Sequence, residues 1–163
     1  MTISNRALAA DRIVRATIDI AARAEDVFEA LTDPRELAAW LGGVDDFIGS
    51  VWTPAAKAGA SWSAAAIAPD GAPGFVRGEF LVVDAPRRLV STWHASWDHY
   101  ARTIVHYELE PVDVEGTPKT RVTVFHSAPA ACAQHASHFG AKGDSWAIML
   151  ARLARLMTER LTV

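Results

Sequence analysis

Residues 145–161 read SWAIMLARLARLMTERL, and this stretch decides the fold that we expect. Its large apolar residues recur three or four residues apart, singly or in adjacent pairs, which is the period of one face of an α-helix. They are Trp146, Met149, Leu150, Leu153, Leu156, Met157 and Leu161. Asp144 stands where a helix N-cap is expected. The stretch predicts a long amphipathic helix from Ser145, which needs a large apolar surface to lie on.

The middle of the chain supplies that surface as a series of predicted strands. The candidate runs are 44–51, 60–67, 75–83, 88–95, 102–109 and 120–125, and the first two are weak. Turn signals such as Pro69-Asp70-Gly71 separate them. Because the connections are short, we expect successive strands to pair antiparallel. Residues 128–140 predict a short helix or a loop that leads into the long helix.

The segment before these strands predicts one further strand and two short helices. Residues 12–20 alternate like a strand, and residues 24–31 have helical spacing without a good N-cap. In the second helix Asp33 can cap, Pro34 suits the first position, and Glu36 can complete a reciprocal capping box. The residues that this helix would bury are Leu37, Trp40 and Leu41.

The order of elements predicts an α+β fold. A curved antiparallel sheet of about six or seven strands would wrap around the C-terminal helix, because two layers are the minimum that buries both apolar faces. Residues 12–163 are expected to form one domain, and residues 1–11 an N-terminal extension. A chain of 163 residues is of ordinary size for one domain.

Composition excludes several classes of function. The net charge is −3 and no basic patch is evident, which argues against nucleic-acid binding. Residues 1–11 contain no continuous apolar run, so we expect neither a membrane span nor a signal peptide, and a cytoplasmic location. The single Cys132 excludes an internal disulfide.

Four stretches in the same order carry a resemblance to a known family. They are residues 18–40 (IDIAARAEDVFEALTDPRELAAW), 78–93 (GEFLVVDAPRRLVSTW), 107–111 with 120–126 (YELEP and TRVTVFH) and 143–146 (GDSW). The chain resembles the bacterial homologues of the activator of heat-shock-protein-90 ATPase. That family belongs to the START-like (SRPBCC) helix-grip superfamily, which also holds birch-pollen-allergen proteins and polyketide cyclases.

The resemblance implies the helix-grip fold strongly and an activity poorly, because the superfamily contains ligand binders, a few catalysts and chaperone regulators. Two positions depart from the family pattern. Arg23 stands where the family commonly has proline near the start of the first short helix. The alanine-rich stretch 55–66 replaces a glycine-rich strand pair.

Strand alternation places a mostly apolar set of side chains between the sheet and the long helix. The inward sets are Phe80 and Val82; Leu89, Ser91 and Trp93; Val105, Tyr107 and Leu109; and Val122, Val124 and His126. The residues that we expect to contact a ligand are Trp40, Phe80, Ser91, Trp93, Tyr107, His126, Trp146, Met149 and Leu150. Such a pocket suits a small hydrophobic or aromatic ligand. The alternative is that the same residues form only a packed core.

No catalytic, metal or cofactor site is predicted. No acidic residue is expected on the face of His126, so a buried histidine that donates to a backbone carbonyl is favoured over a general base. The spacing of Cys132, His135 and His138 would suit zinc on a helix, but a fourth ligand is not evident. Nucleophile-elbow, phosphate-loop and dinucleotide motifs are absent from the sequence. Residues 93–100 form a polar and aromatic loop that either covers the sheet edge or lines a cavity mouth.

Three functions remain open from the sequence. The first is a non-enzymatic module for a small hydrophobic ligand, which requires a cavity and is contradicted by a solid interior of interlocked tryptophans. The second is a protein-interaction module, either a chaperone regulator or a homodimer, whose apolar outer-face candidates are Leu81, Ile104 and Phe125. The third is a cyclase- or hydrolase-like enzyme using Tyr107 and His126. We expect a monomer or a homodimer, without a nucleic-acid or membrane partner.

Overall fold

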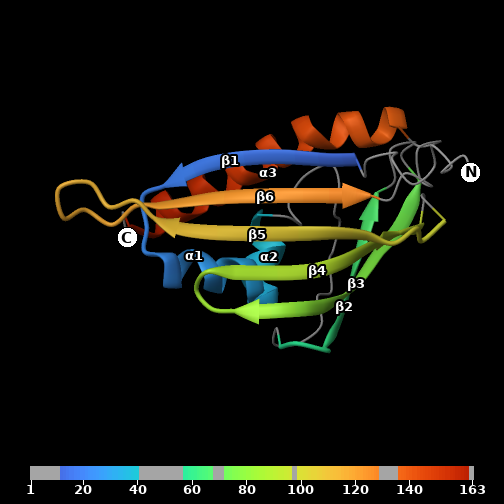
Figure 1. Ribbon diagram of the computed structural model, residues 1–163, viewed down its shortest axis with the longest axis horizontal. Coiled ribbons are helices and arrows are strands. Elements are labelled where there is room, and N and C mark those ends of the chain that lie inside the picture. Colours follow the sequence, from blue (N-terminus) through green and yellow to red (C-terminus); the bar gives the residue numbers. More distant parts are fainter. Residues whose placement is uncertain (1–11, 41–56, 68–71, 97–98, 129–135, 162–163) are drawn as a thin grey trace, which may run out of the picture.

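The computed structural model describes residues 12–40, 57–67, 72–96, 99–128 and 136–161. These residues form a curved, unclosed antiparallel sheet of six strands with three helices on one side of it (Figure 1). The α+β helix-grip fold predicted from the sequence is therefore confirmed. The weak strand prediction for residues 44–51 and the extension 1–11 lie outside the described residues.

The elements follow the predicted order. They are β1 (Arg12–Ile20), α1 (Ala24–Thr32), α2 (Pro34–Trp40), β2 (Ser61–Ile67), β3 (Pro73–Asp84), β4 (Arg88–Ala95), β5 (Thr103–Pro111), β6 (Thr120–Ala128) and α3 (Ala136–Leu161). The order across the sheet is β1-β6-β5-β4-β3-β2. Each of the strands β2 to β6 pairs with the next one in the sequence, and β1 pairs with β6, so that β1 and β2 are the two edge strands.

The start of α2 confirms one half of the predicted capping box. The Asp33 carboxylate accepts a hydrogen bond from the backbone N–H of Arg35 at 2.9 Å, as an N-cap does. The other half is wrong, because the backbone N–H of Asp33 donates to the Glu29 carbonyl at 2.8 Å. Glu36 instead forms an ion pair with Arg160. Its side chain therefore joins α2 to the last turn of α3.

The burial of β4, β5 and β6 confirms the predicted inward sets, but β3 contains a correction. The pairing of β3 with β4 shifts register between Phe80 and Val82, so that Leu81 forms a bulge. After the bulge Val83 packs against the core opposite Leu89, and Val82 does not take the inward position that we predicted. A bulge adds one residue to a strand and so reverses the side-chain alternation beyond it.

The long helix begins earlier than its sequence predicts. It starts at Ala136, so Asp144 lies within the helix and is not its N-cap. The cause of the error is Gly143, which we took as a boundary together with Gly140. Each glycine costs a helix interior about 1 kcal/mol relative to alanine, which tertiary packing can outweigh. The predicted apolar stripe is confirmed at Trp146, Met149, Leu150, Leu153 and Met157, all of which are buried.

The core lies between the inner face of the sheet and α3, and the two short helices complete it. The backbone of α3 runs closest to β1 and, at its end, to α2. Over β3, β4 and β5 the space between sheet and helix is filled by large side chains. None of the helices within the described part of the chain is long and apolar enough to cross a membrane.

Candidate functional site

Five aromatic rings meet on the inner face of the sheet. Trp93 of β4 lies 5.3 Å from Trp62 of β2, 6.0 Å from Trp146 of α3 and 5.8 Å from His126 of β6, measured between ring centroids. Trp146 also contacts Tyr107 of β5 at 5.8 Å, edge to face. Edge-to-face pairs add to the free energy of packing beyond the area they bury. This ring cluster fills the interior where the helix backbone stands away from the sheet.

A chain of hydrogen bonds crosses the ring cluster in one direction. The indole N–H of Trp146 donates to Nδ1 of His126 at 3.1 Å. The hydroxyl of Thr103 donates to the backbone carbonyl of Trp93 at 2.7 Å, so its oxygen accepts from Nε2–H of His126 at 2.8 Å. This network assigns the Nε2–H tautomer to a neutral His126. Both ring nitrogens of His126 are therefore engaged.

The nine residues predicted to contact a ligand fall into two groups by exposure. The first group keeps 7–8% of its surface exposed and comprises Phe80, Ser91, Trp93, Tyr107 and Met149. The second group keeps 1% and comprises Trp40, His126, Trp146 and Leu150. The members of the first group on β3, β4 and β5 are neighbours, because Phe80 pairs with Ser91 and Tyr107 pairs with Leu89 beside it.

Two residues of this more exposed group carry hydroxyls. Ser91 and Tyr107 point to the inner face, and burial raises the pKa of the Tyr107 hydroxyl, which therefore stays protonated. A protonated phenol can both donate and accept a hydrogen bond. The inner face therefore offers a ligand apolar rings and neutral hydroxyls.

Two hollows open elsewhere on the described surface. One, of about 490 Å³, is on the outer face of β2, β3 and β4. The other, of about 650 Å³, is at the end of the sheet between Arg23, which precedes α1, Pro86 and Pro118. In the described part of the chain, no group of three or more His, Cys, Asp or Glu side chains could hold a metal ion. Cys132 and His135, and the side chain of His138, lie outside what the structure describes.

Comparison with known proteins places this geometry in a family. Residues 21–158 match the family described as "Activator of Hsp90 ATPase homolog 1-like protein". The chain belongs to this family. No curated protein matches the sequence.

Solved structures share the fold of this chain at low identity. DynU16, "a putative protein in the dynemicin biosynthetic locus", is 23% identical with a TM-score of 0.67, over 91% of this chain and 48% of that one. The chain thus spans about half of DynU16. MLL2253 from Mesorhizobium loti is 20% identical with a TM-score of 0.69, over 91% and 98%. CalU16 from Micromonospora echinospora is 20% identical with a TM-score of 0.61, over 93% and 80%.

Within this family member the structure changes our interpretation of His126 and Trp40. His126 donates to the Thr103 hydroxyl, which in turn donates to a backbone carbonyl. The predicted direct hydrogen bond from His126 to a carbonyl is therefore wrong, because Thr103 lies between the two groups. The indole N–H of Trp40 donates to the Ala30 carbonyl at 2.8 Å, which ties α2 to α1. Trp40 is therefore an anchor between the two short helices.

Sequence reasoning missed Thr103 and Trp62. Thr103 shares the inward phase of Val105 and Tyr107, so strand alternation alone could have placed it on the inner face. Trp62 lies on β2, which is only a weak strand candidate in the sequence and lies in an alanine-rich stretch. Its alternation with Ala64, which is also buried, was the available signal.

Proposed function

We propose that this chain binds a small hydrophobic or aromatic ligand between the sheet and α3. The observation that supports the proposal is that Phe80, Ser91, Trp93 and Tyr107, on neighbouring strands of the inner face, each keep 7–8% of their surface exposed, as does Met149 of α3. The ligand would lie beside the ring cluster against Met149. A flat apolar molecule would contact rings there and reach the hydroxyl of Ser91 or Tyr107.

The interlocked tryptophans limit this proposal in size. Trp62, Trp93 and Trp146 contact one another in a row, so the middle of the interior is filled by protein. The proposed ligand is therefore one of few rings, accommodated at the side of the row. The fold relatives lend limited support, since one of them, DynU16, belongs to a biosynthetic locus.

Matched tryptophan substitutions on α3 test the proposal. Met149→Trp fills the proposed space, whereas Ile148→Trp adds the same side chain at a position that is 55% exposed. Native mass spectrometry of freshly purified protein and titration with the neutral probe naphthalene are the measurements. We expect saturable binding in the wild type and in Ile148→Trp, and its loss in Met149→Trp. Equal binding by both variants, or none in the wild type, would contradict the proposal.

The geometry gives less support to the enzymatic alternative based on Tyr107 and His126. A general base needs a free lone pair, and Nδ1 of His126 accepts from Trp146 while Nε2 carries the proton. The burial-raised pKa of Tyr107 likewise disfavours a phenolate base. Binding without catalysis is the function that these contacts favour.

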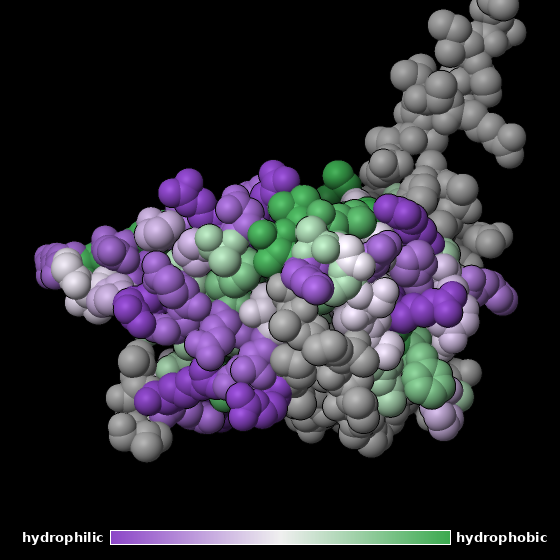
Figure 2. Space-filling view, turned by 90° about the horizontal axis from the view of Figure 1, so that it is seen from below, coloured by the Kyte–Doolittle hydropathy of each residue, from purple (hydrophilic) through white to green (hydrophobic). Residues whose placement is uncertain are grey.

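The alternative function, a protein-interaction module, requires an exposed apolar surface, and its three candidate residues are only partly exposed. Of its three candidates Leu81 is 39% exposed, while Ile104 and Phe125 are half-buried. Seen from below, hydrophobic surface gathers in one patch and hydrophilic side chains cover much of the rest (Figure 2). The exposed large hydrophobic residues of the described chain are Ile13, Phe75, Leu81, Tyr100, Val114 and Ile148. Because they are spread over several strands, a turn and a helix, they do not define one interface.

A further inference from the structure

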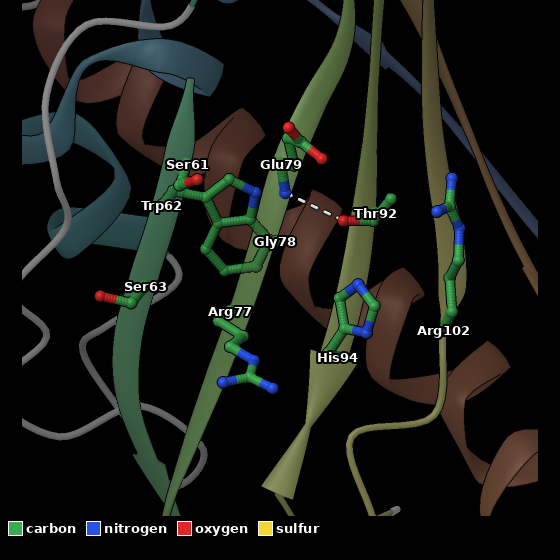
Figure 3. Close-up of a pocket in the computed structure, with 9 residues that line it drawn as sticks. All are labelled: Ser61, Trp62, Ser63, Arg77, Gly78, Glu79, Thr92, His94 and Arg102. Atoms are coloured by element: carbon green, nitrogen blue, oxygen red, sulfur yellow. Dashed lines mark hydrogen bonds between the residues drawn. The ribbon is translucent and has the colours of Figure 1, made fainter. Parts of the chain in front are cut away.

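A polar groove opens on the outer face of the sheet, on the side away from α3. Its volume is about 490 Å³ and it crosses β2, β3 and β4 to the start of β5 (Figure 3). The lining residues are Ser61, Trp62, Ser63, Arg77, Gly78, Glu79, Thr92, His94 and Arg102. The groove is separate from the proposed ligand space on the inner face.

The backbone at Gly78 lies so close to β4 and to Trp62 that only glycine fits there. A Cβ atom at this position would lie 2.0 Å from the Thr92 carbonyl oxygen and 2.6 Å from the indole of Trp62. The next backbone N–H, of Glu79, donates to the side-chain hydroxyl of Thr92 at 2.9 Å. The hydroxyl takes the place that a carbonyl holds in a regular ladder. The floor of the groove is thus the bare backbone of Gly78 beside the Trp62 indole.

Three basic side chains form a row across the groove. Arg77 pairs with His94 in the β3–β4 register, and the pairing of Trp93 with Thr103 puts Arg102 opposite His94 on the far side. The side chains of Arg77 and Arg102 extend to opposite sides of the imidazole (Figure 3). Among the described residues, neither arginine forms an ion pair. A bound anion would compensate the charges of the two guanidinium groups.

The end of the β4–β5 hairpin folds over this row and fixes part of it. The ring of Tyr100 lies 4.2 Å from the Arg77 guanidinium, and the Tyr100 carbonyl accepts from Nδ1–H of His94 at 3.0 Å. Both His99 and Tyr100 adopt a φ of 54°, which is costly for residues other than glycine. The described part of the loop that we considered a cavity mouth therefore orients Arg77 and His94 of the outer groove.

We propose that this groove binds an oxyanion, in the simplest case a carboxylate. The oxyanion would be held by the guanidinium forks of Arg77 and Arg102. The body of the ligand would lie along the groove over the main chain at Gly78. Glu79 at the opposite end of the groove would accept a hydrogen bond from a donor on that body.

Calorimetric titration of the full chain with three probes tests this site. Benzoate carries the proposed carboxylate, phenylphosphate carries the alternative oxyanion, and benzamide is the neutral analogue of benzoate. Arg102→Gln removes an exposed guanidinium of the row, and Arg77→Gln removes its partner. Arg15→Gln is the matched control, because Arg15 lies on the outer face of β1 beside Phe125, outside the groove. Circular dichroism confirms that each variant is folded.

We expect at least one of the two anions to bind saturably, and benzamide to bind at least about ten-fold more weakly. Each groove variant should weaken the anion by about ten-fold, and Arg15→Gln by less than about two-fold. Preference for benzoate or for phenylphosphate identifies the oxyanion. Failure of both anions to bind overturns the proposal, as does equal binding of benzamide or an equal loss in Arg15→Gln. Naphthalene binding should be unchanged in Arg102→Gln, so the two proposed sites can fail separately.

Discussion

The sheet is covered in two different ways on its inner face. Along β1 the backbone of α3 comes close, and the inward side chains of β1 and β6 are small or branched, such as Ala16, Val122 and Val124. Over β3, β4 and β5 the same layer is built from large rings, including Trp93 and Tyr107. We refer to these parts as the close-packed half and the ring half.

The two halves differ in the exposure of their central residues. In the close-packed half Val122 and Val124 are fully buried at 0% exposure, as is Leu153 of α3. In the ring half Ser91 and Trp93 keep 8%. The proposed ligand space lies in the ring half.

The largest expected effect compares two buried residues of α3 that differ in exposure. Leu153→Ala should destabilise the protein by about 2–5 kcal/mol, the usual range for removing a fully buried leucine. Met149→Ala should cost at least about 1 kcal/mol less, because Met149 keeps 7% of its surface exposed and Leu153 keeps none. Urea unfolding followed by circular dichroism measures both. Equal losses would contradict this comparison, and a loss below about 1 kcal/mol for Leu153→Ala would mean that the helix stripe is out of phase.

An intermediate effect is expected from the hydrogen-bond chain of the ring half. Thr103→Val keeps the side-chain shape but removes the acceptor for Nε2–H of His126. A buried donor left without a partner costs about 1–3 kcal/mol. Thr117→Val, in the exposed turn between β5 and β6, is the control and should change stability by less than about 0.5 kcal/mol. The same unfolding experiment measures both variants. A Thr103→Val protein as stable as the control would show that the hydrogen-bond chain contributes nothing to stability.

The smallest effect is expected at the solvent-exposed side of the close-packed half. Arg121 donates two hydrogen bonds to Asp19 across β1 and β6, at 2.9 and 3.2 Å, which lowers the pKa of the Asp19 carboxyl below its ordinary 3.8. A lowered folded-state pKa means that the contribution is complete above 3.8 and is lost as the pH falls below it. The unfolding midpoints of the wild type and Asp19→Asn should differ slightly at pH 6 and converge in strong acid. A difference that grew on acidification would reverse the assigned sign.

Much of the fold could be predicted from the sequence because periodicity reports local geometry. The stripe that contains Trp146 and Leu153 and the alternation around Tyr107 placed the helix and the inner face correctly. The bulge at Leu81 could not be predicted, since residues on both sides of it are apolar and any phase looks acceptable. The start of α3 was missed because glycine at positions 140 and 143 locally disfavours a helix. Both positions nevertheless lie within α3.

The candidate site was predicted less completely, because it depends on contacts between distant elements. The nine residues that we named are buried in the same core, but their division by exposure follows from how tightly α3 approaches each strand. The partners of His126 come from β5 and α3, and sequence separation gives no sign of them. The outer groove was missed because its polar residues, such as Arg77 and Arg102, come from different strands.

The one-way hydrogen-bond chain through His126 has a consequence for how the sequence can change over time. Trp146, His126 and Thr103 each donate one hydrogen bond to the next group, and the last acceptor is a main-chain oxygen. An apolar residue at position 126 would leave the Trp146 indole N–H without its acceptor. Substitution at any one of these positions therefore becomes tolerable chiefly when the others change as well. Descendants of this sequence should carry the polar set together or lose it together, so the three positions should covary among relatives.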